Sequence, residues 1–384
     1  GNVSFVNLRD RTGVLQIFAK GFKELGNLTP ESVIVASGVI KKGMQKSGAK
    51  ELVLDKFEVM NKAETPLPVD LIQDTTHMDK RMDFRHLDLH NIKIQSIFKI
   101  QSEILHSFRE YFYKEGFVEF QTPSIISSAS EGGTDLFEIK YFNEKAYLAQ
   151  SPQLYKQMGA TSLEKVTMIS TVWRAEKHDT VRHLNESRQM DMEEAFVDDF
   201  GAMKRMEECI PFIVKDINKN CKNELKVLDI NLKVPKFKYL SYKETIKLLK
   251  VKNGEDLTPE KEKELNFKYP NTVVFVYDWP LDLKPFYIMP KDKKIAKGFD
   301  AIFNGMEISS GGQRIHLPDL LSERIKAKKL GVKNFKGYID SFRHGSPLHS
   351  GFSIGLERFT MALLNLNNIR EATLYPRDRY RLTP

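Results

Sequence analysis

The sequence has few cysteines and no long apolar run, and both absences narrow the class of protein. Only Cys209 and Cys221 occur among 384 residues. Two cysteines cannot form a disulfide framework or a four-cysteine zinc site, which is typical of a reducing compartment and gives no sign of thiol catalysis. No stretch approaches the roughly 20 apolar residues that span a bilayer. We therefore expect a soluble cytoplasmic protein without a membrane partner.

The two common glycine-rich phosphate loops are also missing. Neither G-x-x-x-x-G-K-[ST] nor G-x-G-x-x-G occurs in the chain. Any nucleotide chemistry must therefore use another kind of site. The formal net charge of +8 favours a polyanionic partner, although the excess of basic residues is spread along the chain.

Length and periodicity predict two domains with an α+β fold. Apolar residues alternate in four short segments of the first domain, at 3–8, 14–19, 33–40 and 52–59. A five-stranded β-barrel of the OB type needs one more strand, which we expect before residue 1. We place this domain at 1–62, a proline-containing linker at 63–80 and the second domain at 81–384.

The second domain opens with helical spacing and continues with strands. A helix is predicted from Ile94 to Gly116, followed by a strand that ends at Pro123. Residues 200–265 are predicted to be a mostly helical, lysine-rich insertion. Further strands are predicted at 273–277 and 300–308, and a strand-to-helix segment at 345–364.

Two short segments carry arginines suited to a nucleotide. Arg174 and Glu176 precede His183, and Arg358 ends the sequence Gly-Leu-Glu-Arg. A planar guanidinium can bind phosphate oxygens and stack on a purine ring. Each arginine alone is more often an exposed ion pair, but two on separate segments can clamp a nucleotide without a phosphate loop.

Taken in order, these segments resemble the three motifs of the class II aminoacyl-tRNA synthetases, in the aspartyl and asparaginyl subgroup. The helix and strand ending at Pro123 are similar to motif 1, residues 174–193 to motif 2, and residues 355–358 to motif 3. The resemblance covers almost the entire chain. It implies an antiparallel six-stranded sheet flanked by helices, an OB-type anticodon-binding domain and a homodimer formed through motif 1.

The resemblance also implies roles for the matching residues. Arg174 holds the ATP α-phosphate and the substrate carboxylate, and Arg358 stacks on adenine and neutralises phosphate, so these two are the expected catalytic residues. Glu176 reads the amino edge of adenine, and His183 reaches toward the γ-phosphate. Ser187 stands where the family often has an aromatic residue under adenine, and guanidinium stacking by Arg188 is the alternative.

Asp300, Glu307 and Ser310 offer the oxygen ligands that Mg²⁺ prefers beside phosphate. The spacing of seven between Asp300 and Glu307 is odd, so on one strand these side chains would face opposite sides. A shared metal ion then needs a bend or one indirect ligand. The resemblance favours Glu307 and Ser310 as direct contacts, and the alternative for Asp300 is a turn residue.

The amino-acid pocket is expected around residues 130–133, which resemble a loop that closes over the substrate, and around Gln153. The resemblance places Glu131, Gln153 and Asp191 at the α-ammonium group. Lys156 and Arg314 would repel each other when buried unless a carboxylate lay between them, which favours L-aspartate over the neutral asparagine. His349 is expected to have a structural role, with a second carboxylate contact as the alternative.

In the first domain, Phe5 and Gln16 match positions that meet the middle anticodon base in the family. An aromatic ring can stack on an unpaired base, and an amide can hydrogen-bond to its edge. The alternative for Phe5 is a residue of the barrel core, and the direction of its side chain distinguishes the two.

The implied activity is aspartate–tRNA ligation, in which ATP and Mg²⁺ convert L-aspartate to aspartyl-adenylate and the aspartate passes to tRNA(Asp). The alternatives are an asparaginyl-tRNA synthetase and a non-catalytic paralogue that binds RNA or protein, which need not keep its active-site residues. A paralogue that makes asparagine should lack the anticodon domain. Charging of tRNA(Asn) stays open.

Overall fold

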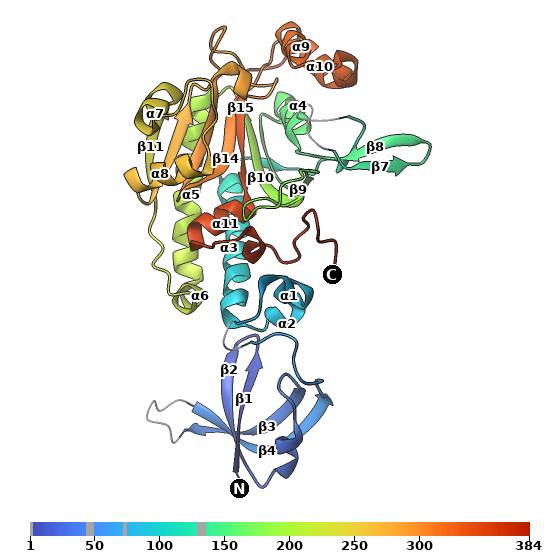
Figure 1. The fold of residues 1–384 in the computed structure, drawn as a ribbon, viewed down its shortest axis with the longest axis vertical. Helices are drawn as coiled ribbons and strands as arrows, with labels where there is room; N and C mark the ends of the chain where they lie inside the picture. The colour runs from blue at the N-terminus through green and yellow to red at the C-terminus, as the bar shows by residue number, and fades with distance from the viewer. Residues whose placement is uncertain (1–2, 44–49, 72–74, 129–135) are drawn as a thin grey trace. The chain divides into compact units, whose positions relative to one another are not determined.

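The computed structural model describes residues 3–43, 50–71, 75–128 and 136–384 (Figure 1). The chain divides into two compact units, Gly1–Lys80 and Arg81–Pro384. Across these described ranges, no helix combines the length and the apolar character needed to cross a bilayer.

The first unit is a four-stranded sheet with the strand order β1-β2-β4-β3. Its elements are β1 (Val3–Asp10), β2 (Gly13–Lys20), η1 (Lys23–Asn27), β3 (Val33–Lys42) and β4 (Lys50–Asn61). β1 and β2 are antiparallel, and Val3 is the Cα partner of Lys20 at the open end of the pair. In the turn that joins them, the Asp10 carboxylate accepts hydrogen bonds from the backbone N–H groups of Thr12 and Gly13. The inward residues Ile17, Ala19, Leu25, Leu52 and Leu54 form the core. All four expected strands are confirmed.

The second unit is built on an eight-stranded sheet with the order β11-β12-β13-β14-β15-β10-β9-β5. In that order the strands are β11 (Lys236–Ser241), β12 (Thr272–Tyr277), β13 (Gly298–Phe303), β14 (Met306–Gln313), β15 (His349–Gly355), β10 (Glu186–Ala195), β9 (Lys165–Trp173) and β5 (Val118–Glu119). The six strands from β12 to β9 are antiparallel to their neighbours, whereas β11 and β5 pair in parallel at the two edges. The expected antiparallel sheet is confirmed and extended by two edge strands.

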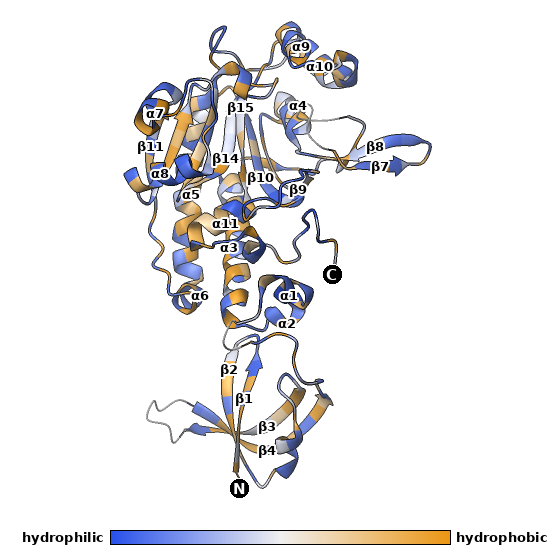
Figure 2. Ribbon diagram, viewed as in Figure 1, coloured by the Kyte–Doolittle hydropathy of each residue, from blue (hydrophilic) through white to orange (hydrophobic). Residues whose placement is uncertain are grey.

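One face of this sheet packs on two long helices, α3 (Ile92–Lys114) and α5 (Asp199–Asn220) (Figure 1). Asn91 caps α3 by accepting a hydrogen bond from the N–H of Lys93, and Gly116 with φ of 80° follows its end. Apolar and polar residues alternate along both helices, as Figure 2 shows. The apolar side is buried against Met190, Met192, Phe299 and Phe352 of the sheet. The opposite face of the sheet is therefore left for polar side chains.

The remaining elements are shorter. They are α1 (Met78–Asp83), α2 (Arg85–Asp88), β6 (Ile125–Ile126), β7 (Glu138–Tyr141), β8 (Glu144–Leu148), α4 (Gln153–Leu163), α6 (Lys222–Val227), α7 (Tyr242–Leu249), α8 (Pro259–Lys268), η2 (Leu281–Leu283), α9 (Pro318–Ala327), η3 (Val332–Phe335), α10 (Lys336–Arg343), α11 (Leu356–Leu364) and η4 (Ile369–Ala372). α11 follows β15 directly, which confirms the expected strand-to-helix segment.

One sequence expectation differs from the structure. The strand expected at 300–308 is the hairpin of β13 and β14, because Asn304 and Gly305 adopt positive φ values of 47° and 75° and form a two-residue turn. The expectation of a mostly helical segment at 200–265 is confirmed, because α5, α6, α7 and most of α8 lie there, with β11 between α6 and α7. In β11, the Phe237 ring stacks on Phe275 of β12, and the Tyr239 ring packs against Phe275 at a tilt. This aromatic packing favours a strand here.

Candidate active site

A cavity of about 370 Å³ lies on the face of the sheet opposite α3 and α5. Its size suits a small-molecule site. The residues expected from the sequence that line it are Gln153, Arg174, Glu176, His183, Asp191, Glu307, Ser310, Arg314 and Arg358. Lys156 and Asp300 do not line it, Glu131 lies outside the described residues, and Phe5 and Gln16 belong to the other unit.

Several buried polar atoms of the cavity wall have no hydrogen-bond partner within the described part of the chain. They are Gln153 Nε2, Gln189 Oε1, Asp191 Oδ2, Ser309 Oγ and Ser353 Oγ. Leaving a buried polar group unpaired costs about 1–3 kcal/mol, so a group of such atoms around one cavity indicates a polar ligand. The donor and acceptor chemistry suits a molecule with both ammonium and carboxylate groups.

Successive side chains of β10 point to opposite faces of the sheet, so one set faces the core and the other faces the site. Met190 and Met192 face the helices, whereas Asp191 and Glu193 face the cavity side. Lys156 Nζ, on α4, lies 2.8 Å from Asp191 Oδ1 and 3.6 Å from Glu193 Oε2. Its Nζ also donates to the Phe352 carbonyl oxygen at 3.0 Å. Burial raises the pKa of Asp191, and the Lys156 charge opposes that rise.

Arg314 follows β14 and binds the same glutamate from the other side. Its Nε lies 2.8 Å from Glu193 Oε1, and its Nη2 lies 3.3 Å from Oε2. Glu193 therefore separates the two cations Lys156 and Arg314, and their repulsion alone does not require a carboxylate substrate. Sequence reasoning missed Glu193, although its place two residues after Asp191 on a predicted strand puts both on one face.

Gly351 gives the Glu193 carboxylate its space. It is the Cα partner of Glu193 between β15 and β10. A Cβ added at Gly351 would overlap Glu193 Oε2 and the Met192 carbonyl oxygen. The glycine is thus required by close approach of the two strands.

The nucleotide-binding residues expected from the sequence come from the loop between β9 and β10 and from α11. Asn185 closes the base of this loop, because its Nδ2 donates to the carbonyl oxygens of Arg174 at 2.7 Å and Glu176 at 2.9 Å. His183 Nδ1 lies 2.6 Å from Thr180 Oγ1. Burial and the positive charge of Arg358 lower the pKa of His183.

The hairpin of β13 and β14 brings the expected metal ligands onto one face. Asp300 is the Cα partner of Ser310, and a bulge at Ile308 restores Glu307 to the same face. Asp300 Oδ2 lies 2.6 Å from Lys284 Nζ. Burial and the charge of Asp300 raise the pKa of Glu307 to about 7. Because a bound cation would relieve the repulsion between these two carboxylates, the pair suits an ion that also binds phosphate.

No group of three or more His, Cys, Asp and Glu side chains able to hold a metal ion occurs in the described ranges. Mg²⁺ is usually bound by one or two carboxylates together with phosphate and water, so Glu307 and Ser310 fit an ion that arrives with a nucleotide. The ion pair with Lys284 makes Asp300 an indirect contributor to such a site.

The other residues considered from the sequence occupy structural positions. Arg188 Nη2 lies 3.0 Å from Glu186 Oε1, and Ser187 lines the cavity whereas Arg188 does not. His349 is fully buried, and its Nε2 lies 3.2 Å from Gln157 Oε1. Both cysteines are free and buried, and burial raises the pKa of Cys221 to about 11.

Phe5 points outward from the small sheet. Its side chain is 61% exposed, and its ring makes an edge contact with Phe18, the Cα partner of Phe5 on β2. Asn7, two residues after Phe5 on β1, is the Cα partner of Gln16 on β2. Phe5 and Gln16 therefore lie on the same face of the sheet. The alternative of a core residue for Phe5 is therefore wrong.

Comparisons with known proteins agree with this geometry. Residues 77–379 match the family model of tRNA synthetases class II (D, K and N), and residues 1–60 match that of the OB-fold nucleic acid binding domain. The chain is 42% identical to an aspartate–tRNA(Asp) ligase of Pyrococcus horikoshii, over 100% of this chain and 93% of the relative. It is 43% identical to an aspartate–tRNA(Asp/Asn) ligase of Methanocaldococcus jannaschii, over 100% of this chain and 92% of the relative.

Solved structures show the same fold. An asparaginyl-tRNA synthetase of Pyrococcus horikoshii complexed with asparaginyl-adenylate is 32% identical, with a TM-score of 0.96 over 100% of this chain and 93% of that chain. An aspartyl-tRNA synthetase of Entamoeba histolytica is 32% identical, with a TM-score of 0.89 over 100% of this chain and 87% of that chain. The expected OB fold and synthetase-type catalytic fold are confirmed. The chain belongs to the class II tRNA synthetases of the aspartate, lysine and asparagine group.

Proposed function

We propose that this protein is an aspartate–tRNA ligase, which condenses L-aspartate with ATP to give aspartyl-adenylate and pyrophosphate and then transfers aspartate to the 3′ end of tRNA(Asp). The observation that carries the proposal is the cavity that combines Arg174, Arg358 and Arg314 with five buried polar atoms that lack a partner among the described residues. The relatives named as aspartate ligases, at 42% and 43% identity over the whole chain, favour aspartate.

Activation in this site is a matter of position and charge. Arg174 binds the α-phosphate and the reacting carboxylate, which brings the attacking oxygen in line and stabilises the charge that develops at phosphorus. Arg358 stacks on adenine, Glu176 receives the adenine amino group, and His183 reaches the γ-phosphate. Glu307 and Ser310 would hold Mg²⁺, with Asp300 acting indirectly, and the ion would neutralise phosphate charge.

The amino acid lies beside β10 and α4. Its α-ammonium group binds the unpartnered Asp191 Oδ2, with help from Gln153 and from Glu131 of the loop at 130–133. Arg314 lines the cavity and receives the side-chain carboxylate, while Lys156 holds Asp191 and Glu193 in place. An asparagine side chain offers Arg314 a neutral amide in place of a carboxylate and so loses a charge-assisted hydrogen bond, which disfavours it.

Residues 1–62 bind the anticodon, residues 63–80 are the linker, and residues 81–384 carry out catalysis. Phe5 stacks on the middle anticodon base, and Gln16 hydrogen-bonds to its edge. The exposed position of Phe5 supports this assignment. The protein acts in the cytoplasm as a homodimer formed through α3 and β5.

The test is exchange of labelled pyrophosphate into ATP by the full chain. We expect exchange with L-aspartate and at least about 100-fold less with L-asparagine, because a site built for a charged partner rejects its neutral analogue. Exchange that depends on asparagine would establish the asparaginyl alternative, and the absence of exchange with either would favour a non-catalytic paralogue. Charging of purified tRNA(Asp) and tRNA(Asn) in separate reactions then decides whether both are substrates.

A further inference from the structure

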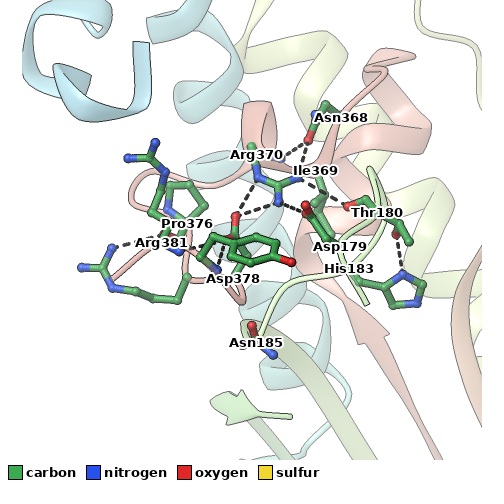
Figure 3. Close-up of polar contacts among 12 residues, drawn as sticks. Asp179, Thr180, His183, Asn185, Asn368, Ile369, Arg370, Pro376, Asp378 and Arg381 are labelled. Carbon is green, nitrogen blue, oxygen red and sulfur yellow. Dashed lines mark hydrogen bonds and ion pairs between the residues drawn. The ribbon is translucent and has the colours of Figure 1, made fainter. Parts of the chain in front are cut away.

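The loop from Arg174 to Asn185 is held by the C-terminal segment as well as by its own contacts (Figure 3). The backbone N–H of Asn185 donates to the Arg377 carbonyl oxygen at 2.8 Å, and the N–H of Ile369 donates to the Val181 carbonyl oxygen at 2.9 Å. Arg379 Nη1 donates to the Lys177 carbonyl oxygen at 3.2 Å. Three points along the loop are thus attached to residues 369–379.

Arg370, in η4, is the centre of this attachment. Its Nε lies 2.8 Å from Asp378 Oδ2, and its Nη2 lies 2.7 Å from the same oxygen and 2.9 Å from Asp179 Oδ1. Figure 3 shows its guanidinium between the two carboxylates. The Arg370 and Asp378 side chains are only 12% and 7% exposed, whereas Asp179 is 47% exposed. The buried pair thus presents a fixed cation to the loop.

Thr180 connects the Arg370 guanidinium to His183 of the nucleotide site. Arg370 Nη1 donates to the Thr180 carbonyl oxygen at 3.4 Å, and Thr180 Oγ1 lies 2.6 Å from His183 Nδ1. Thr180 therefore links the guanidinium to the imidazole. A small displacement of a binding group strongly weakens its contact with the ligand. The placement of His183 therefore depends on the contacts that Arg370 makes with the loop.

We propose that Arg370 is a positioning residue of the nucleotide site. It fixes the loop through Asp179 and Thr180 so that His183 points into the cavity, and Asp378 holds Arg370 in the required orientation. The inference rests on the proposed function for the identity of the nucleotide, although binding of Mg-ATP tests it without any aminoacylation. The Arg370 guanidinium makes these contacts through charge-assisted hydrogen bonds to Asp179 and Asp378.

Asp179 gives the sharpest test, because it is partly exposed and its substitution leaves the Arg370–Asp378 pair intact. Asp83 is the matched control: it is 55% exposed and pairs with Arg381 of the same C-terminal segment, but on α1 rather than on the loop. We expect D179N to raise the Kd for Mg-ATP, measured by calorimetry on the full chain, about fivefold and D83N to change it less than about twofold. The matching result in pyrophosphate exchange is a higher KM for ATP with an unchanged KM for L-aspartate.

A second pair of variants tests the guanidinium itself. We expect R370Q to raise the Kd for Mg-ATP about tenfold, R370K to recover part of the loss, and R381Q to stay within about twofold of the parent chain. If R370Q does not fold, D179N and D83N decide the question. Equal effects of D179N and D83N, or equal increases in KM for ATP and L-aspartate, would mean that Arg370 only stabilises the fold. A chain that binds Mg-ATP as expected but shows no aspartate-dependent exchange would overturn the proposed function and leave this inference standing.

Discussion

The Glu193 carboxylate and the Arg314 guanidinium form a buried ion pair, with 2.8 Å between Oε1 and Nε. Lys156 Nζ approaches the other carboxylate oxygen at 3.6 Å. With Asp191, these side chains make a set of two cations and two carboxylates whose charges balance. In the proposed function a substrate carboxylate competes with Glu193 for Arg314, so this glutamate would tune the affinity of the site for its amino acid.

Substitution of Glu193 by glutamine should destabilise the protein. The change removes one of the two negative charges that face Lys156 and Arg314, and breaking a buried ion pair costs about 3–5 kcal/mol. We expect the free energy of unfolding, measured by urea denaturation, to fall by about that amount. D340N, which removes a partly exposed partner of Lys336 and Arg343 on the surface of α10, is the control and should cost less than about 1 kcal/mol. Equal losses in the two variants would show that Glu193 is not an essential counter-ion.

Gly351→Ala should disturb the same site through volume instead of charge. The added methyl group overlaps the Glu193 carboxylate and the Met192 carbonyl, so β10 and β15 must move apart. We expect a loss of about 1–3 kcal/mol in the free energy of unfolding and a higher KM for L-aspartate. Gly337→Ala on α10 is the control, because a Cβ there meets no atom within 4 Å and alanine favours a helix. A G351A protein as stable as G337A would contradict the close packing.

Glu357 should make stability depend on pH. Burial raises the pKa of its carboxyl group to about 7, whereas an unfolded glutamate has a pKa of about 4.3. The folded protein therefore binds the extra proton between these values, and the stability contributed by this group is lost as pH rises through that window. We expect wild type to lose up to about 3 kcal/mol relative to E357Q between about pH 5 and about pH 8. Parallel stability curves for the two proteins, from urea denaturation at each pH, would exclude the shift.

Phe5→Ala should weaken tRNA binding without affecting activation of the amino acid. The ring is exposed, so its removal leaves the core of the small sheet intact. Stacking on an unpaired base contributes about 1–3 kcal/mol, which predicts a Kd for tRNA(Asp) about 5–150-fold higher by filter binding. Pyrophosphate exchange should stay at the parent rate. Val3→Ala, the next outward position on β1 at 43% exposure, is the control, and an equal effect there would argue against a specific stack.

Local pattern alone determined much of this protein. The four strands of the first unit, the helix α3 and the step from β15 to α11 follow from periodicity and from glycine and proline positions, which act over neighbouring residues. Arg174, Glu176 and Arg358 could be named because their segments, taken in order, resemble motifs 2 and 3 of the class II synthetases. The Asn304-Gly305 turn was also readable, since this pair strongly favours a two-residue hairpin, yet the alternation around it concealed the turn.

Tertiary packing decided the rest, because those contacts join residues far apart in the chain. Glu193 reaches Arg314 across 121 positions, and Arg370 reaches Asp179 across 191, and no local period encodes such distances. The bulge at Ile308, which brings Glu307 to the face of Ser310, depends on how β14 pairs with β13. The sequence by itself thus supplied the reactive groups and their secondary structure, whereas the packed sheet chose which charges neutralise one another and which remain for a substrate.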